Sequence, residues 1–201
     1  MNQSEHSDPS AKLRTSLLAI LARESYFERE VTLSSGKKSD FYLDCRRAIF
    51  LPEAAHLAGE LMLELVTAAG VEQIGGMAVA AVPVIDAIIA AAYRHKVAIR
   101  GCFVRKEAKR HGLQQSIEGA FKPGLKTAVI DDAVTTGGSS LVAAEAMCTA
   151  GAEVIAALAL VDRGEGGAEA FAGARMAFRA VFTAAEIRAE HARQSQAARK
   201  S

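Results

Sequence analysis

The sequence predicts an α/β domain built on a central, mainly parallel sheet flanked by helices, and two features of the chain support this prediction. Short apolar, strand-like runs alternate with helical segments between residues 73 and 161, and these runs are nearly continuous in hydrophobic residues. Strands of this kind are typical of a parallel sheet that helices cover on both faces. The 201 residues, 50% of them hydrophobic, suffice for one sizeable core. We therefore expect one domain over residues 1–201, with ligands at the carboxyl ends of its strands.

The N-terminal part of the chain predicts a leader, a helix and a small hood. Residues 1–10 are polar and lack the basic start and apolar run of a signal peptide, so we expect a loose leader. Asp8-Pro9 supplies a helix start, and apolar residues recur at helical spacing as far as about Arg23. Two β-prone pieces, 31–33 and 41–43, flank a turn-forming stretch. Residues 11–50 should therefore form a helix followed by a hairpin or hood.

The rest of the chain predicts a second helix, the alternating core and a C-terminal helix. Pro52 opens the second helix, and Gly70 can end it in the left-handed conformation. The core covers about residues 70–183. Its expected elements are, in order, a strand at 73–79, a helix at 83–93, strands at 97–104 and 127–130, a helix at 138–150 and a strand at 154–161. Residues 184–201 are helical in composition but charged, so we expect the end of this tail to fray.

Charge balance, cysteine spacing and hydropathy exclude several classes of protein. The chain has 24 Lys and Arg against 23 Asp and Glu, so its net charge of +1 gives no large field for nucleic acid or an acidic membrane. Cys45, Cys102 and Cys148 match neither a zinc site nor a disulfide framework and suit a reducing cytosol. No apolar run reaches the ~18 residues of a membrane helix. We expect a cytoplasmic protein without nucleic-acid or membrane partners.

The segment after the strand at 127–130 has the composition of a sugar-phosphate site. Asp131-Asp132 is followed by a loop rich in threonine, glycine and serine, and then by a helix. Glycines let the backbone approach a phosphate, hydroxyls add donors, and the helix N-terminus adds positive potential. The loop lacks the endings of a nucleoside-triphosphate P-loop and of a dinucleotide fingerprint. Two adjacent carboxylates would repel a phosphate unless they faced hydroxyls or a developing positive charge, both of which a ribose supplies.

Val-Ile-Asp-Asp-Ala-Val-Thr-Thr-Gly-Gly-Ser at 129–139 resembles the phosphoribosyl-diphosphate motif of type I phosphoribosyltransferases. The resemblance extends over about residues 13–181 and implies the fold of that family, with its N-terminal hood. It implies that Asp131 and Asp132 are catalytic and hold the ribose 2′- and 3′-hydroxyls. It also implies that the rest of the motif binds 5-phosphoribosyl 1-diphosphate, with the 5-phosphate cradled from Thr135 onward: Ala133, Val134, Thr135, Thr136, Gly137, Gly138 and Ser139. The alternative is an ordinary strand-to-helix turn with solvated acids and capping hydroxyls.

A basic loop follows the strand that ends at Val104. Four cations and a histidine crowd into residues 105–112, and they repel one another unless a polyanion such as a diphosphate draws them together. The order Arg-Lys-Glu-x-Lys-x-His-Gly resembles the mobile catalytic loop of orotate phosphoribosyltransferases. The resemblance implies a homodimer that shares loop 105–118 between subunits, with Lys109 catalytic and the diphosphate bound by Arg105, Lys106, Lys109 and His111. The alternative is a solvated basic loop.

Arg163 follows the last predicted strand and could recognise the base. The parallel N–H groups of arginine match a carboxylate, which orotate has and uracil lacks. The resemblance implies that Arg163 and Thr135 contact orotate, and a local Asp162–Arg163 ion pair is the alternative. Many relatives carry lysine where this chain has Ser34 and Ala80, so backbone N–H groups must contribute more to diphosphate binding.

Together the motifs predict transfer of the 5-phosphoribosyl group to N1 of orotate, giving orotidine 5′-monophosphate and diphosphate in de novo pyrimidine biosynthesis. Mg²⁺ would be carried mainly by the diphosphate, with no direct ligand from the chain. Positioning and charge should supply most of the rate, with Lys109 neutralising the leaving diphosphate. Two alternatives stay open: an enzyme that uses a purine or uracil with the same donor, and a regulator that senses 5-phosphoribosyl 1-diphosphate without catalysis.

Overall fold

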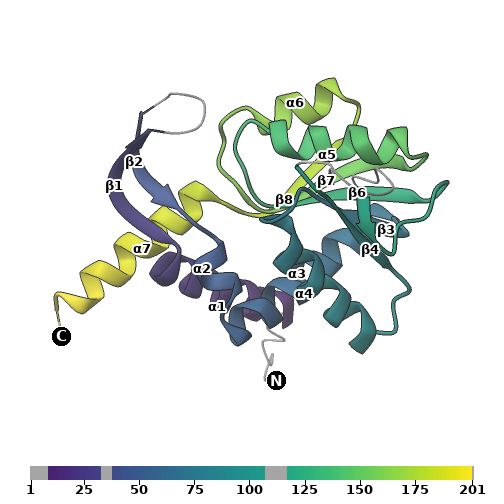
Figure 1. Ribbon diagram of the computed structural model, residues 1–201. Helices are drawn as coiled ribbons and strands as arrows, with labels where there is room; N and C mark the ends of the chain where they lie inside the picture. The colour runs from purple at the N-terminus through teal and green to yellow at the C-terminus, as the bar shows by residue number, and fades with distance from the viewer. Residues whose placement is uncertain (1–8, 33–37, 107–116, 201) are drawn as a thin grey trace, which may run out of the picture.

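The computed structural model describes residues 9–32, 38–106 and 117–200, which form a central sheet between two layers of helices and a separate hairpin (Figure 1). The six-stranded sheet has the order β5-β4-β3-β6-β7-β8. Every neighbouring pair is parallel except β4 and β5. The strands are β3 (Gln73–Gly75), β4 (Arg100–Val104), β5 (Ile117–Gly119), β6 (Lys126–Val134), β7 (Glu153–Asp162) and β8 (Ala177–Thr183). The predicted α/β class and mainly parallel sheet are confirmed.

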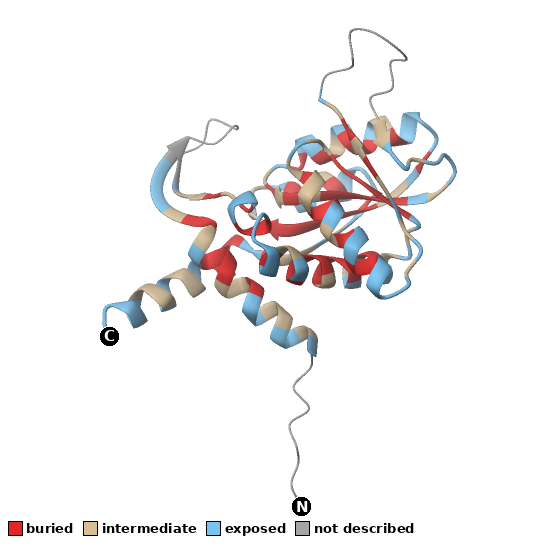
Figure 2. Cartoon of the chain, turned by 60° about the horizontal axis from the view of Figure 1, so that its bottom comes forward, coloured by how far each residue is buried: buried red, intermediate tan, exposed pale blue. Residues whose placement is uncertain are grey.

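Helices cover both faces of the sheet because successive side chains of its central strands point to opposite faces. On one face, Ala128 and Ile130 of β6 join the core that includes α1 (Pro9–Glu24), α3 (Pro52–Ala69) and α4 (Ala81–Arg94). On the other, Val129 packs with α5 (Gly138–Thr149) and α6 (Gly167–Gly173). Figure 2 shows the resulting buried band along the middle of the sheet.

The hairpin consists of β1 (Tyr26–Thr32) and β2 (Lys38–Leu43), which pair antiparallel. It confirms the predicted hood, although its strands are longer than the two β-prone pieces. A short helix, α2 (Arg46–Ile49), leads from the hairpin to α3. The last helix, α7 (Ala184–Ala198), lies beside β1 (Figure 1) and begins with a capping box made by Thr183 and Glu186.

Three predicted strand boundaries differ from the structure. The strand expected at 73–79 ends at Gly75, because the chain turns at Gly76 so close to β6 that a Cβ there would lie 2.3 Å from the carbonyl oxygen of Ile130. The strand expected at 97–104 begins at Arg100, since the N–H of Val97 closes the end of α4 on Ala92. The strands β5 and β8 and the helix α6 were not predicted as separate elements.

The third difference bears on the site. The strand expected at 127–130 runs on to Val134, because β7 continues beside it and pairs Asp131 with Ala159 and Ala133 with Val161. The two acids therefore lie within a strand and not in the loop after it.

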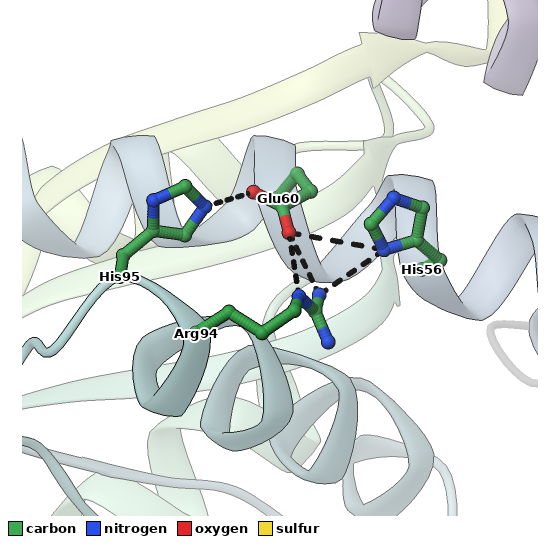
Figure 3. A network of polar contacts seen from close by, with 4 residues as sticks. All are labelled: His56, Glu60, Arg94 and His95. Carbon is green, nitrogen blue, oxygen red and sulfur yellow. Dashed lines mark hydrogen bonds and ion pairs between the residues drawn. The ribbon is translucent and has the colours of Figure 1, made fainter.

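Glu60 of α3 joins that helix to the end of α4 (Figure 3). Its carboxylate accepts hydrogen bonds from Arg94 Nη2 at 2.7 Å and Nε at 3.2 Å, and lies 2.6 Å from Nε2 of His95. His56, one turn earlier on α3, contacts Arg94 at 3.1 Å. Among the described helices, none is both long enough and apolar enough to span a bilayer.

Candidate active site

A pocket of about 680 Å³ opens at the carboxyl ends of β3, β4 and β6. In open α/β sheets, ligands bind at this edge of the strands. The turn after β3, Lys106 after β4, and the segment from β6 into α5 form its walls. The lining residues are Met77, Ala78, Ala80, Lys106, Asp131, Asp132, Ala133, Thr135, Thr136, Gly137, Gly138, Ser139 and Val142. Most of the motif predicted from the sequence therefore surrounds one cavity.

The acidic pair is held by short hydrogen bonds from its own surroundings. Ser140 Oγ donates to Oδ2 of Asp131 at 2.5 Å, and the N–H of Asp132 donates to Oδ1 of Asp131 at 3.0 Å. Oδ1 of Asp132 accepts the N–H of Ala133 at 2.9 Å. Both carboxylates line the pocket, so the groups that hold them also orient them toward a ligand.

Burial raises the pKa of both carboxyls. For Asp132 burial is the largest cause, the charge of Asp131 adds to it, and the pKa rises to about 7. For Asp131 burial again raises the pKa, although the hydrogen bond from Ser140 lowers it in part. Two carboxyls in this state are good acceptors for hydroxyl donors, since each hydrogen bond from a ligand offsets part of the cost of the buried charge.

The loop between β6 and α5 lines the pocket. Gly137 is the N-cap of α5 with φ 77°, and a Cβ there would lie 3.1 Å from the ring of Phe171. Within the described residues, no side chain caps this helix, so its first N–H groups are available to a ligand. Such a helix start binds anions, and Thr135, Thr136 and Ser139 add hydroxyls around it. Between Asp131 and Ser139, only Val134 does not line the pocket, because its side chain is buried in the core.

The basic loop is described only at its two ends. Lys106 lines the pocket, as expected of a diphosphate-binding residue. Arg105 instead places Nη1 2.9 Å from the carboxylate of Glu118. Lys109 and His111 lie outside the described residues, as does Ser34 of the hood. Ala80 does line the pocket, so a neutral side chain stands where a lysine would have brought charge.

Arg163 is a buried cation at the end of β7. Its side chain is 7% exposed, and Cζ lies 5.2 Å from the centre of the Phe41 ring in the hood. Nε lies 2.8 Å from Glu165, but in the part of the chain that the structure describes neither Nε nor Nη2 has a hydrogen-bond partner. The carboxylate of Asp162 accepts the N–H of Gly164. The ion pair of Arg163 is with Glu165, and none is seen between Asp162 and Arg163. A buried guanidinium with unused donors is suited to an anionic ligand.

Sequence reasoning missed three residues that lie close to predicted site residues. Ser140 lies in the first turn of α5, and nothing in its own position signals that it holds Asp131. Phe41 was placed in the hood, but its contact with Arg163 joins segments distant in sequence. Cys45 is buried close enough to Asp132 for that charge to raise the pKa of its thiol, although burial is the larger cause. A thiol with a raised pKa is a poor nucleophile, so Cys45 has a packing role.

Comparison with known proteins gives a consistent result, although no protein-family model matches the sequence. The chain is 40% identical over 172 residues to the orotate phosphoribosyltransferase of Rhodopirellula baltica, covering 83% of this chain and 89% of that protein. It is 42% identical over 178 residues to that of a Bradyrhizobium species, covering 87% and 96%. The Mycobacterium tuberculosis orotate phosphoribosyltransferase in complex with 5-phospho-α-D-ribosyl 1-diphosphate superposes with a TM-score of 0.74 at 35% identity, covering 87% of this chain and 98% of that chain.

Proposed function

This chain belongs to the orotate phosphoribosyltransferase family, and we propose that it works through the pocket at the carboxyl ends of β3, β4 and β6. It transfers the 5-phosphoribosyl group of 5-phosphoribosyl 1-diphosphate to orotate, giving orotidine 5′-monophosphate and diphosphate in pyrimidine biosynthesis. The observation that supports the choice of pocket is the buried acidic pair beside the uncapped start of α5.

The ribose and its 5-phosphate occupy the β6–α5 side of the pocket in this proposal. Asp131 and Asp132 accept hydrogen bonds from the 2′- and 3′-hydroxyls, which relieves the cost of their burial. The 5-phosphate sits on the N–H groups and hydroxyls of residues 135–139. As positive charge develops on the ribose ring in the transition state, the two carboxylates stabilise it at short range.

The diphosphate lies toward the turn after β3 and the basic loop. Lys106 is already on the pocket wall, and we assign Arg105, Lys109 and His111 to the diphosphate as well. We assign Lys109 to the neutralisation of the leaving diphosphate, and we propose that a homodimer shares this loop between its subunits. Because Ala80 brings no charge, the N–H groups of the turn at 77–80 carry more of the binding, apart from that of Ala78, which donates to the carbonyl oxygen of Val104.

Mg²⁺ fits this site as a partner of the diphosphate. Among the described residues there is no group of three or more His, Cys, Asp or Glu that could hold a metal ion. Mg²⁺ is commonly bound through substrate phosphates, so the diphosphate would carry the ion, with no direct ligand from the chain. When bound, the ion would neutralise charge on the diphosphate.

The base is recognised by Arg163 and Thr135 in this proposal. The N–H donors of Arg163 that lack a hydrogen-bond partner among the described residues match the carboxylate of orotate. Thr135 lines the pocket and follows the acidic pair closely in the sequence. Deprotonated N1 of orotate then attacks C1 of the ribose as the bond to diphosphate breaks, so no covalent enzyme intermediate is needed. The free cysteines suit a cytoplasmic location, which we also propose.

The test follows the loss of orotate absorbance in the presence of 5-phosphoribosyl 1-diphosphate and Mg²⁺, with uracil and adenine as control bases. Of the three bases, we expect substantial turnover only with orotate and at most trace turnover with uracil or adenine. Turnover with uracil or adenine at a comparable rate would contradict the assignment of the base, and failure to bind the donor at all would contradict the assignment of the pocket.

A further inference from the structure

Arg163 stands at one end of a series of ring contacts that begins in the C-terminal helix. Its guanidinium lies over Phe41 of β2, and Phe41 stacks on Tyr26 of β1 with ring centres 5.4 Å apart and planes at 19°. Tyr26 in turn contacts His191 of α7, with ring centres 4.8 Å apart. We call His191, Tyr26 and Phe41 the stacked series. It crosses from α7 through both strands of the hood, which lie side by side in Figure 1.

The helix that carries His191 is itself anchored at several points. Nδ1 of His191 donates to the carbonyl oxygen of Ala22 at 2.8 Å, and Nε2 of Gln194 donates to that of Ala19 at 3.0 Å. Glu186 pairs with Arg14 of α1. These contacts fix α7 against α1, so the outer end of the stacked series is held by the body of the protein.

The way in which Arg163 is held matters for its donors. A ring face holds the plane of a guanidinium without using any N–H group, because the attraction acts on the face of the cation. The side chain is thus restrained while Nη2 has no hydrogen-bond partner among the described residues, and Nε lies 2.8 Å from the carboxylate of Glu165. Tyr26 supports Phe41 through its ring alone, since its buried hydroxyl also lacks a partner in that part of the chain.

We propose that His191 and Tyr26 are positioning residues for orotate recognition and act through Phe41 on Arg163. The inference rests on the proposed contact between Arg163 and the base. Loosening the series at either residue lets Phe41 and the guanidinium move, which weakens the match to a carboxylate. Binding of 5-phosphoribosyl 1-diphosphate, on the β6–α5 side of the pocket, should be unaffected.

Two substitutions at His191 separate its ring from its hydrogen bond. His191→Gln keeps a donor for Ala22 but removes the ring, and we expect the KM for orotate to rise about three- to tenfold. The KM for 5-phosphoribosyl 1-diphosphate should change less than twofold. His191→Phe keeps a ring without the donor and should recover most of the affinity for orotate. Arg193→Ala is the matched control, because Arg193 lies on the exposed side of the same helix and pairs only with Glu190 among the described residues.

Tyr26 gives a second comparison that does not depend on the fold of α7. Tyr26→Phe keeps the ring and loses a hydroxyl without a described partner, whereas Tyr26→Leu removes the ring from a buried position. We expect only the leucine variant to raise the KM for orotate. Melting temperatures identify any variant that fails to fold, in which case the His191 pair decides the matter.

The results distinguish this inference from the proposed function. If His191→Gln leaves the KM for orotate unchanged while Arg163→Ala raises it, the stacked series has no positioning role and the assignment of Arg163 stands. If both His191 variants raise that KM equally, the ring is not the active feature and the inference is wrong. If Arg163→Ala itself leaves it unchanged, the proposed contact with orotate fails and this inference fails with it.

Discussion

The hydroxyl of Ser140 donates a hydrogen bond of 2.5 Å to the carboxylate of Asp131, and this bond joins the end of β6 to the first turn of α5. Ser140 is 2% exposed, so its hydroxyl is buried, whereas Asp131 also lines the pocket. The acidic pair and the N–H groups that precede α5 are therefore held in one fixed relation. In the proposed reaction, this relation sets the distance between the ribose hydroxyls and the 5-phosphate.

Ser140→Ala should weaken binding of 5-phosphoribosyl 1-diphosphate. A hydrogen bond to a charged group in a buried site contributes enough binding free energy that its loss should raise the KM for 5-phosphoribosyl 1-diphosphate roughly tenfold. The pKa of Asp131 should rise further, because the bond from Ser140 lowers it. Steady-state kinetics with the donor varied measures the effect, and Ser16→Ala on the exposed face of α1 serves as control. An unchanged KM would mean that Asp131 is oriented without Ser140.

Asp132→Asn should make the free protein more stable at neutral pH while activity is largely lost. The pKa of Asp132 rises from an ordinary 3.8 to about 7, first through burial and then through the charge of Asp131. A carboxyl with a raised folded pKa contributes stability below its unfolded pKa, and this contribution is lost as pH rises through the folded value. The variant should thus be more stable at pH 8 by up to about 4 kcal/mol, and by less at pH 5.

Calorimetry of both proteins at pH 5 and pH 8, without ligands, measures this difference. Equal gains in melting temperature at the two pH values would show that the ionisation of Asp132 is not what costs stability.

Lys109→Ala should lower kcat far more than it weakens binding. Lys109 lies outside the described residues, and its assignment comes from the order of residues in the basic loop. If it neutralises charge that develops on the leaving diphosphate, its removal should cost about a hundredfold or more in kcat, with little change in either KM. Lys12→Ala, on an exposed turn of α1, is the control. Equal kcat under saturating substrates would remove Lys109 from the catalytic residues.

Arg163→Ala should reduce the preference for orotate over uracil. A site whose donors match a substrate carboxylate rejects the analogue that lacks it, and truncation removes that advantage. We expect kcat/KM for orotate to fall about a hundredfold, with little change for the trace activity on uracil. Parallel assays with the two bases measure the ratio. A ratio equal to that of the unmodified enzyme would place base recognition elsewhere.

Glu60→Gln should destabilise the fold without affecting catalysis. Burial alone would raise the pKa of Glu60, but the hydrogen bonds from Arg94 and His95 outweigh it, and the pKa is lowered (Figure 3). A lowered folded pKa contributes stability above the unfolded pKa that is lost as pH falls through the folded value. We expect a loss of about 1–2 kcal/mol at pH 7 in denaturant unfolding, and a smaller loss at pH 3 to 4.

The exposed Glu145→Gln substitution on α5 is the control for Glu60. A loss of stability that does not depend on pH would contradict the role assigned to the charge of Glu60.

The sequence by itself predicted the features of this protein that depend on residues close together along the chain. The motif at 129–139 is contiguous, so its acids, glycines and hydroxyls predict a sugar-phosphate site without knowledge of the fold. The apolar runs likewise predict buried parallel strands. A strand that helices cover on both faces has apolar side chains on both, so polar and apolar residues do not alternate along it.

Tertiary structure decided whatever depends on segments that meet only after folding. The continuation of β6 through Asp131 follows from its pairing with β7, and β5 and β8 are edge strands defined by one partner each. The contact between Arg163 and Phe41, and the anchoring of α7 against α1, join distant parts of the chain. Such contacts leave no periodic pattern or fixed spacing in the sequence. Their free energy comes from surfaces that meet only when the sheet and helices have formed.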